Sequence, residues 1–291
     1  HRLFRHCATI SLTGGEPSMR KDFAELPSLL AEVMPALRQV NLTSNGYAVD
    51  PIMNGAASFV PALRARGVGF SVNLSIDGVG EAHNIVRNNP RAWEHLDATL
   101  RGLVDLRKRV PFNLVLACTF THSNVQDARK ILEYAKALGV YVIFRRAFSI
   151  DRIENQGIYR NIEPTPAQDV EIKAFLREVR DQYDSSRARG LYYDMLLGML
   201  DGADRTIPCL YRKAGLFVDH RGDFYVCTVF SKRIGNGLTQ DPEEIYFRSL
   251  AHRDELAASA CLKCSHDVTL YPPFKDQAAD RIRAAITKVR R

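Results

Sequence analysis

Short runs of apolar and β-branched residues alternate with segments of helical periodicity over the first half of the chain. The first pattern is typical of buried strands, and apolar residues that recur every three to four positions are typical of helices. Their alternation with short connections predicts a parallel α/β sheet, either flat or curled into a barrel. The predicted strands are 8–12, 39–44, 70–76, 113–119 and 140–145, and the predicted helices are 20–37, 55–66, 93–110 and 125–138.

Several residues between these segments match the chemistry of helix ends. Asn124 stands where it can cap the helix that follows it, and Gly67 and Gly139 stand just past predicted helix ends. Glycine is common there because the chain adopts a left-handed backbone conformation at that point.

The alternation stops near Pro164. Two helices are expected over 164–189 and 191–200, followed by two strands at 215–219 and 223–227. The strands are joined by His220, Arg221 and Gly222, which predicts a hairpin with Gly222 at the position that needs a positive φ.

The 291 residues carry a formal charge of +7, which raises the question of a nucleic-acid partner. The basic residues are spread along the chain, with local clusters only at 101–109, 145–146 and 281–291, and no RNA-binding signature accompanies them. A solvated basic surface is the simpler interpretation, and nucleic acid is not expected as a partner. No apolar stretch is long enough to span a membrane and no signal peptide is visible, so a cytoplasmic protein without a membrane partner is expected.

Three polar or glycine-rich clusters each follow directly on a predicted strand, namely 13–17, 43–46 and 75–78. Ligands of parallel α/β folds bind at the carboxyl ends of the strands, so the clusters converge on one expected site. Gly14 and Gly15 let the backbone approach a ligand, Glu16 offers an acceptor for an ammonium group, and Asp77 can accept hydrogen bonds from ribose-like hydroxyls. Each cluster alone is no more than a turn signal.

The run from Ile10 to Pro17 resembles the GGEP motif of the radical S-adenosylmethionine enzyme superfamily. The later clusters resemble the strand ends that line the same cofactor pocket in that family. The resemblance implies an α/β fold, a partial (β/α)6 barrel whose first βα unit is missing here, with S-adenosylmethionine as cofactor. By this resemblance the principal cofactor-site candidates are Gly14, Gly15, Glu16, Pro17, Ser44, Ser75 and Asp77. Their places at strand ends make Asn45, Thr119, Asn124 and Arg145 weaker candidates.

The sequence departs from the family in one respect. The family holds its catalytic [4Fe–4S] cluster through a CxxxCxxC motif ahead of GGEP, and only Cys7 precedes Gly14 here. Either the chain is a fragment that lacks this segment, or it is a non-catalytic relative. The first residue is His1 and not Met, which favours the fragment.

Four of the six cysteines, Cys209, Cys227, Cys261 and Cys264, fall in the last third of the chain. Clustered cysteines in a chain without a secretion signal favour metal binding, whereas Cys7 and Cys118 are expected to be small buried residues. The C-x12-G-x4-C spacing followed by CxxC resembles the SPASM and twitch extensions, in the short form of 2-deoxy-scyllo-inosamine dehydrogenase-like enzymes. An auxiliary [4Fe–4S] cluster on these thiolates is therefore expected, with a zinc site or unrelated cysteines as alternatives and His220 and His266 as alternative ligands.

The resemblance implies three domains: the partial barrel at 1–163, bridging helices at 164–203 and the auxiliary-cluster domain at 204–291. It also implies that S-adenosylmethionine is reductively cleaved to a 5′-deoxyadenosyl radical, with flavodoxin or ferredoxin as the reductant. The radical would abstract a hydrogen atom from a small-molecule substrate, with a peptide substrate or a non-catalytic role as alternatives. Arg145 and Arg146 could anchor an anionic substrate or pair with a carboxylate of the barrel.

Overall fold

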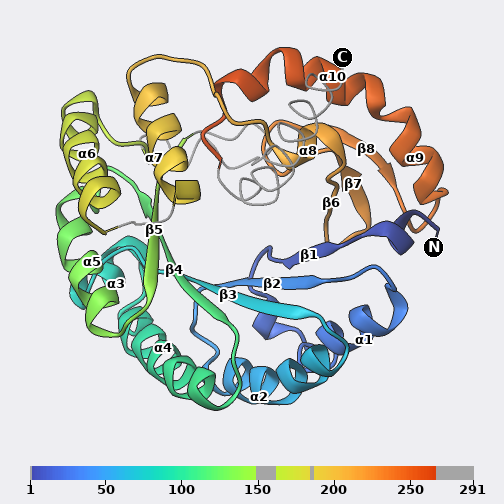
Figure 1. Ribbon diagram of the computed structural model, residues 1–291, viewed down its shortest axis with the longest axis horizontal. Coiled ribbons are helices and arrows are strands. Elements are labelled where there is room, and N and C mark those ends of the chain that lie inside the picture. Colours follow the sequence, from blue (N-terminus) through green and yellow to red (C-terminus); the bar gives the residue numbers. More distant parts are fainter. Residues whose placement is uncertain (1, 149–161, 184–186, 267–291) are drawn as a thin grey trace, which may run out of the picture. The chain divides into compact units, whose positions relative to one another are not determined.

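The computed structural model describes residues 2–148, 162–183 and 187–266 of the 291-residue chain. The chain divides into two compact units, His1–Arg145 and Arg146–Arg291 (Figure 1). The basic cluster at 281–291 and the end of the third expected domain, 267–291, lie outside the described residues.

The first unit is built on a five-stranded sheet whose neighbouring strands are also consecutive in sequence. The first four strands pair in parallel, and Leu42 lies beside Leu12 on one side and Val72 on the other. The predicted parallel α/β fold is therefore confirmed. The strands are β1 (Thr9–Leu12), β2 (Gln39–Ser44), β3 (Gly69–Ser75), β4 (Asn113–Phe120) and β5 (Tyr141–Arg146).

The helices of this unit lie along the outer face of the curved sheet (Figure 1). On that face Phe59 packs against Phe70 of β3, with ring centroids 4.9 Å apart, and Phe120 stacks on Phe144 at 5.4 Å. Burial of such large apolar side chains is the main favourable contribution to this fold. The helices are α1 (Leu26–Val33), α2 (Val49–Ala65), α3 (Glu81–Arg87), α4 (Ala92–Arg109) and α5 (Ala128–Ala137), with short 3-10 turns η1 (Arg2–His6), η2 (Pro17–Met19) and η3 (Val125–Asp127).

Two helices differ from their predicted ranges for reasons that involve proline. The helix expected at 20–37 forms only over Leu26–Val33, since Pro27 suits a first helical turn and Pro35 stands just beyond the end. The helix expected at 55–66 begins earlier, at Val49, because Pro51 falls in its first turn, where a missing N–H costs nothing. Pro61 lies inside the same helix, which continues past it to Ala65.

The expected helix-end glycines are confirmed, and the expected cap is wrong. Gly67 and Gly139 have φ values of +70° and +60°. Asn124 makes no side-chain cap to the turn that follows it. Its Oδ1 instead accepts from the Thr121 amide at 2.8 Å, and its Nδ2 donates to the Thr119 carbonyl at 3.0 Å. Asn124 therefore fixes the end of β4 and not the start of the helix.

Two cysteines of the first unit differ in burial. Cys118 lies on β4 and is fully buried, as expected. Cys7 precedes β1 and is only half-buried, because it lies at the end of the exposed first turn and not in the sheet. Its thiol donates to the Thr9 carbonyl at 3.2 Å.

The second unit begins with helices, continues with a small antiparallel sheet and ends, in its described part, with further helices. The π-helical turn η4 (Val179–Tyr183) continues α6, which starts with a capping box between Thr165 and Gln168. The expected hairpin is confirmed, with Gly222 at a φ of +79°, and a third strand that was not predicted completes the sheet. The remaining elements are α6 (Pro166–Glu178), α7 (Arg187–Leu200), α8 (Leu210–Lys213), β6 (Phe217–Val218), β7 (Asp223–Tyr225), β8 (Arg233–Asn236), α9 (Pro242–Arg248), α10 (Leu250–Ala258) and η5 (Ala260–Lys263).

Candidate functional site

Glu16 joins the first two strand-end clusters. Its Oε1 accepts from the Ser44 hydroxyl at 2.9 Å and from the Ser18 hydroxyl at 2.7 Å. Its Oε2 accepts from the Asn45 amide at 2.7 Å. The carboxylate is therefore engaged largely by the protein, and it holds the ends of β1 and β2 together.

The two glycines before Glu16 border open space. Gly14 has a φ of +127°, which disfavours any side chain, and no atom lies within 4 Å of where a Cβ of Gly14 or Gly15 would stand. Both residues are exposed, whereas Pro17 is buried at the first position of η2. The backbone of the two glycines is thus accessible to a ligand, as a cofactor cradle requires.

Asp77 is buried behind the end of β3, and its charge has a partner. Its carboxylate lies 2.5 Å from Nε of Arg87 and also accepts a hydrogen bond from the backbone of Thr119. The Asp77 amide donates to Nδ1 of His83 at 3.1 Å. Gly78 follows in close contact with α3, since a Cβ there would lie 2.7 Å from the His83 nitrogen. The third cluster is therefore clamped onto α3.

Three residues near these clusters, Tyr47, His83 and Arg87, were not predicted from the sequence. The Tyr47 hydroxyl and Nε2 of His83 are buried without a hydrogen-bond partner, and the two rings lie 6.4 Å apart. The charges of Arg87, Asp77 and Glu16 all act on the pKa of the Tyr47 phenol, which burial raises. Tyr47 therefore lies near both the first and the third cluster. Its position one residue after Gly46 was the only available signal.

The other candidates are distributed as follows. Ser75 ends β3 and is half-buried, and Thr119 and Asn124 hold the end of β4 as described above. Arg145 lies near the end of β5. Arg146 pairs with Glu163 at 3.0 Å and Asp169 at 2.7 Å, so its guanidinium is engaged by carboxylates of its own unit.

The face of the sheet opposite the helices carries small polar side chains. Because Phe70 and Leu74 of β3 are buried on the helical face, the residues alternating with them point to the other face. Asn41 donates to the Ser11 hydroxyl across this face at 3.3 Å. Over β1 to β3 the register places no charged residue there. The residues on this face are Thr9, Ser11, Gln39, Asn41, Thr43, Gly69, Ser71, Asn73 and Ser75.

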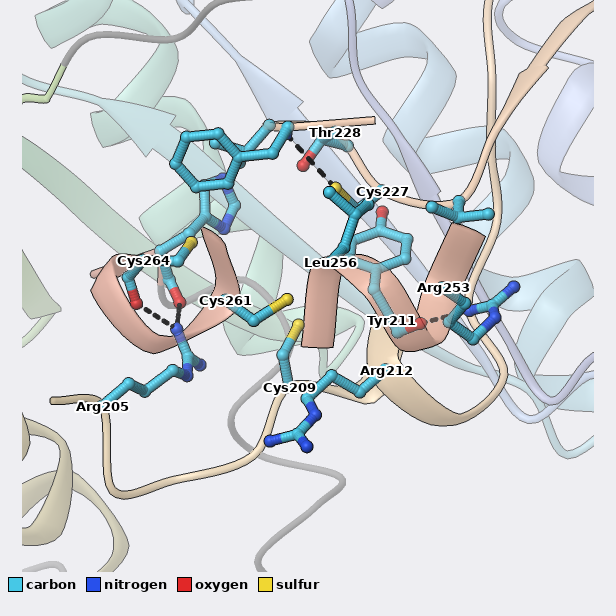
Figure 2. A pocket seen from close by; sticks show the side chains of 14 residues that line it. Arg205, Cys209, Tyr211, Arg212, Cys227, Thr228, Arg253, Leu256, Cys261 and Cys264 are labelled. Atoms are coloured by element: carbon cyan, nitrogen blue, oxygen red, sulfur yellow. Dashed lines mark hydrogen bonds between the residues drawn. The ribbon is translucent and has the colours of Figure 1, made fainter. Parts of the chain in front are cut away.

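The four cysteines of the second unit line one pocket with a volume of about 480 Å³, part of it open to solvent (Figure 2). Cys209 stands directly before α8, and Cys227 follows β7. Cys261 and Cys264 lie on and after η5. These four cysteines form no disulfide with one another, and Phe230 donates its amide to the Cys227 sulfur at 3.4 Å. His266 also lines the pocket, whereas His220 lies exposed in the hairpin turn.

The thiols act on one another electrostatically. Burial raises the pKa of Cys264 to about 11, although the positive charge of Arg205 acts to lower it. Burial also raises the pKa of Cys261, and Cys227 and Cys209 raise it further, opposed by Arg212 and Arg205. The four sulfurs are therefore close enough to interact, with arginines beside them.

The two possible metal groups require different spacings of the thiols. A tetrahedral zinc ion holds its sulfurs about 3.8 Å from one another, given a Zn–S bond of about 2.3 Å. Among the described residues, no group of three or more His, Cys, Asp or Glu side chains is arranged to hold a single metal ion. A cubane cluster binds each thiolate through a different iron, so it needs sulfurs that are further apart. Four thiols around one pocket supply the number of ligands that either group needs.

Comparison with known proteins supports the sequence resemblance. No protein-family model matches the chain. A GTP 3',8-cyclase of Pasteurella multocida is 32% identical over 96 residues, which are 29% of this chain and 26% of that protein. The solved structure of anSMEcpe with bound AdoMet has a TM-score of 0.54 at 17% identity and covers 95% of this chain and 84% of its own.

A second solved structure is Streptococcus suis SuiB bound to the precursor peptide SuiA, with a TM-score of 0.51 at 14% identity, covering 82% of this chain and 54% of that one. These matches support the radical S-adenosylmethionine superfamily. The structural likenesses show the fold, and the chain spans about a quarter of the length of the cyclase. In the described part of the chain, no helix has the length and apolar character needed to cross a membrane.

Proposed function

We propose that the chain is part of a radical S-adenosylmethionine enzyme, and that the three strand-end clusters of its first unit bind this cofactor. The observation that carries the proposal is the junction of two clusters through Glu16, next to the open backbone of Gly14 and Gly15. A ligand at this edge would meet free glycine backbone, the buried Tyr47 hydroxyl and the polar ends of β1 to β3.

The site residues would have different roles in binding the cofactor. Gly14 and Gly15 would contact the methionine part of the cofactor, and Glu16 and Pro17 would hold that loop in place. Ser44, Ser75 and Asp77 would line the pocket at the next two strands, with Asp77 held by Arg87. When bound and reduced, S-adenosylmethionine supplies a 5′-deoxyadenosyl radical. That requires a catalytic [4Fe–4S] cluster, and the CxxxCxxC motif for it is absent from this sequence.

The second unit would hold an auxiliary [4Fe–4S] cluster in a twitch-like domain. Cys209, Cys227, Cys261 and Cys264 are its proposed ligands, because all four line one pocket. When bound, such a cluster supplies a site that accepts or donates single electrons. We propose the domains 1–163, 164–203 and 204–291, and an electron-donor protein such as flavodoxin or ferredoxin as partner.

The proposed reaction is oxidation or another modification of a small polar molecule. The uncharged hydroxyl and amide side chains on the face of β1 to β3 opposite the helices support this class of substrate, since they offer donors and acceptors without a fixed charge. A peptide substrate is the second candidate, favoured by the likeness of the fold to SuiB with its bound precursor peptide.

Iron content and cofactor binding test this function separately. Anaerobic reconstitution of the chain should give about four irons, with the absorption of a [4Fe–4S] cluster. The Cys261→Ala and Cys264→Ala variants should lose that iron, and Cys7→Ala, a cysteine outside the pocket, should keep it. Equilibrium dialysis with labelled S-adenosylmethionine should show binding that Gly15→Ala weakens. Stoichiometric zinc in place of iron, or no cofactor binding by the wild type, would contradict the proposal.

A further inference from the structure

Arg205 connects two of the cysteine-bearing segments of the pocket. Its Nη1 donates to the carbonyls of Cys264 at 2.6 Å and His266 at 2.9 Å, and its Nε donates to the Ile207 carbonyl at 2.5 Å. Its backbone amide donates to the Leu262 carbonyl at 2.7 Å. One residue therefore holds both the middle and the end of the CxxC turn.

The contacts of Arg205 join two segments that are far apart in the sequence. Arg205 and Ile207 belong to the segment that leads directly to Cys209 and α8. The CxxC turn lies more than fifty residues later, on η5. Because the guanidinium is planar and rigid, its three carbonyl contacts fix the orientation of the turn as well as its distance. The relative placement of Cys209 and Cys264 thus depends on this side chain.

The charge of Arg205 is not cancelled by a carboxylate. Its three acceptors are neutral carbonyls, and the ion pairs of the described residues give it no acidic partner. The nearby carboxylate of Asp204 is paired with Lys263 at 2.7 Å. Nη2 of Arg205 is buried and has no hydrogen-bond partner. A buried donor without a partner costs about 1–3 kcal/mol, so this atom marks a place where an acceptor is missing.

Arg205 also lines the pocket that the four thiols share, and Figure 2 shows it beside Cys264 at the base of the CxxC turn. Four thiolates around a metal group bring several negative charges into a partly buried pocket. A fixed cation with a free donor at that place would offset them, and hydrogen bonds to the sulfurs together with net charge set the potential of an iron–sulfur cluster.

We propose that Arg205 is the positioning residue of this metal centre: it orders the CxxC turn before the metal group arrives, and its Nη2 donates to a sulfur once the group is bound. The proposal rests on the auxiliary cluster proposed above. The positive charge stabilises the more negative, reduced state, so Arg205 raises the reduction potential of the centre. Arg253, also in the pocket lining, acts differently, since it donates to the carbonyls of Tyr211 and Gly215.

The test compares Arg205→Met and Arg205→Lys with Arg212→Met. Arg212 is the matched control because it lines the same pocket but is exposed, so water screens its charge. After anaerobic reconstitution, Arg205→Met should bind clearly less iron than the wild type, and the cluster that it holds should have a lower reduction potential. Arg205→Lys should restore most of the reduction potential, because it keeps the positive charge. It should restore less of the iron content, because it lacks the planar guanidinium. Arg212→Met should keep the iron content of the wild type. Because the charge of Arg212 is exposed and screened by water, its removal should lower the reduction potential less than Arg205→Met does.

Hydrogen exchange of the metal-free chain tests whether Arg205 orders the CxxC turn, independently of the cluster. Arg205→Met should speed exchange at peptides covering 204–209 and 260–264, and Arg212→Met should not. Unchanged exchange, or unchanged iron content and potential in Arg205→Met, would overturn the inference. A wild-type chain that takes up no iron would overturn the proposed function instead, while the exchange experiment would still decide the positioning role in the metal-free protein.

Discussion

The carboxylate of Glu16 accepts a hydrogen bond from the Ser44 hydroxyl at 2.9 Å, which ties the end of β1 to the end of β2. The same carboxylate accepts from the Asn45 amide at 2.7 Å. A residue expected from the sequence to serve a ligand therefore also organises the strand ends. Loss of Glu16 would consequently affect both stability and ligand binding, and an experiment on this residue must separate the two.

Glu16→Gln measures the effect on stability, in the absence of any ligand. Glutamine has one acceptor oxygen in place of two and no charge, so either the Asn45 amide or the two serine hydroxyls lose the charged acceptor that they have in the wild type. We expect the free energy of unfolding to fall by about 1–3 kcal/mol, measured by urea denaturation. Glu25→Gln, an exposed glutamate on the same segment, should leave it unchanged. Equal unfolding midpoints for wild type and Glu16→Gln would show that the junction contributes nothing.

The ion pair between Asp77 and Arg87 gives a second prediction. Asp77 is buried, whereas the Arg87 side chain is 29% exposed, so the pair is partly screened. Arg87→Met should destabilise the fold by about 1–3 kcal/mol, less than for a fully buried pair, because it leaves Asp77 without its cation. Asp77→Asn combined with Arg87→Met should recover part of the loss. Additive effects in this double-mutant cycle would mean that the two side chains do not interact.

An exposed pair serves as the control for that cycle. Arg20 and Asp22 lie 2.7 Å apart, and both side chains are at least half exposed. Since exposed pairs contribute little, Arg20→Met should shift the unfolding midpoint much less than Arg87→Met.

Two glycines that look alike in the sequence should respond differently to the same substitution. Gly15 has no atom within 4 Å of a Cβ position, so Gly15→Ala should keep its stability. Its added methyl would occupy the proposed cofactor cradle, and we expect weaker S-adenosylmethionine binding on the order of tenfold, or about 1.4 kcal/mol. Gly78→Ala would place Cβ 2.7 Å from backbone of α3, so it should destabilise the unit by about 1–3 kcal/mol.

Urea unfolding and equilibrium dialysis on both variants check this contrast. The reverse pattern, with a stable Gly78→Ala variant and an unfolded Gly15→Ala variant, would mean that the two strand ends are wrongly described. Unaltered cofactor binding in a folded Gly15→Ala variant would remove Gly15 from the site.

The strands were predictable because local sequence determines them. The β2 run at 39–44 is bounded by turn residues, and its predicted and observed ranges agree. The α3 helix was missed because seven residues are too few for a clear helical period. The β8 strand was missed because Arg233–Asn236 contains a glycine and no β-branched run, so only its pairing with β7 makes it a strand.

Only the part of the site that lies directly after the predicted strands could be predicted from the sequence. The strand ends with Gly14, Ser44 and Asp77 follow from the rule that parallel strands share one edge for ligands. Tyr47, Arg87 and Arg205 could not be predicted, because their importance depends on partners that the fold brings from elsewhere. The contacts of Arg205 with a turn nearly sixty residues away have no signal in the sequence.

The buried His83 gives a prediction for pH dependence. Burial, with the charge of Arg87, lowers the pKa of His83 to about 4 from its ordinary value of 6.5. The Asp77 amide donates to Nδ1, so a proton on that nitrogen would break this hydrogen bond. Above pH 6.5 the ring is neutral in both the folded and the unfolded chain, and its contribution to stability is constant.

Between pH 6.5 and about 4, the unfolded chain takes up a proton on His83 and the folded chain does not, so stability falls as the pH falls. The loss is on the order of 1 kcal/mol for each pH unit in this window. The difference in unfolding free energy between wild type and His83→Asn, measured at pH 7, 6 and 5, should therefore shrink with decreasing pH. His122→Asn, at an exposed position, should show no such trend. A difference for His83→Asn that stays constant over this range would mean that His83 can be protonated in the folded protein.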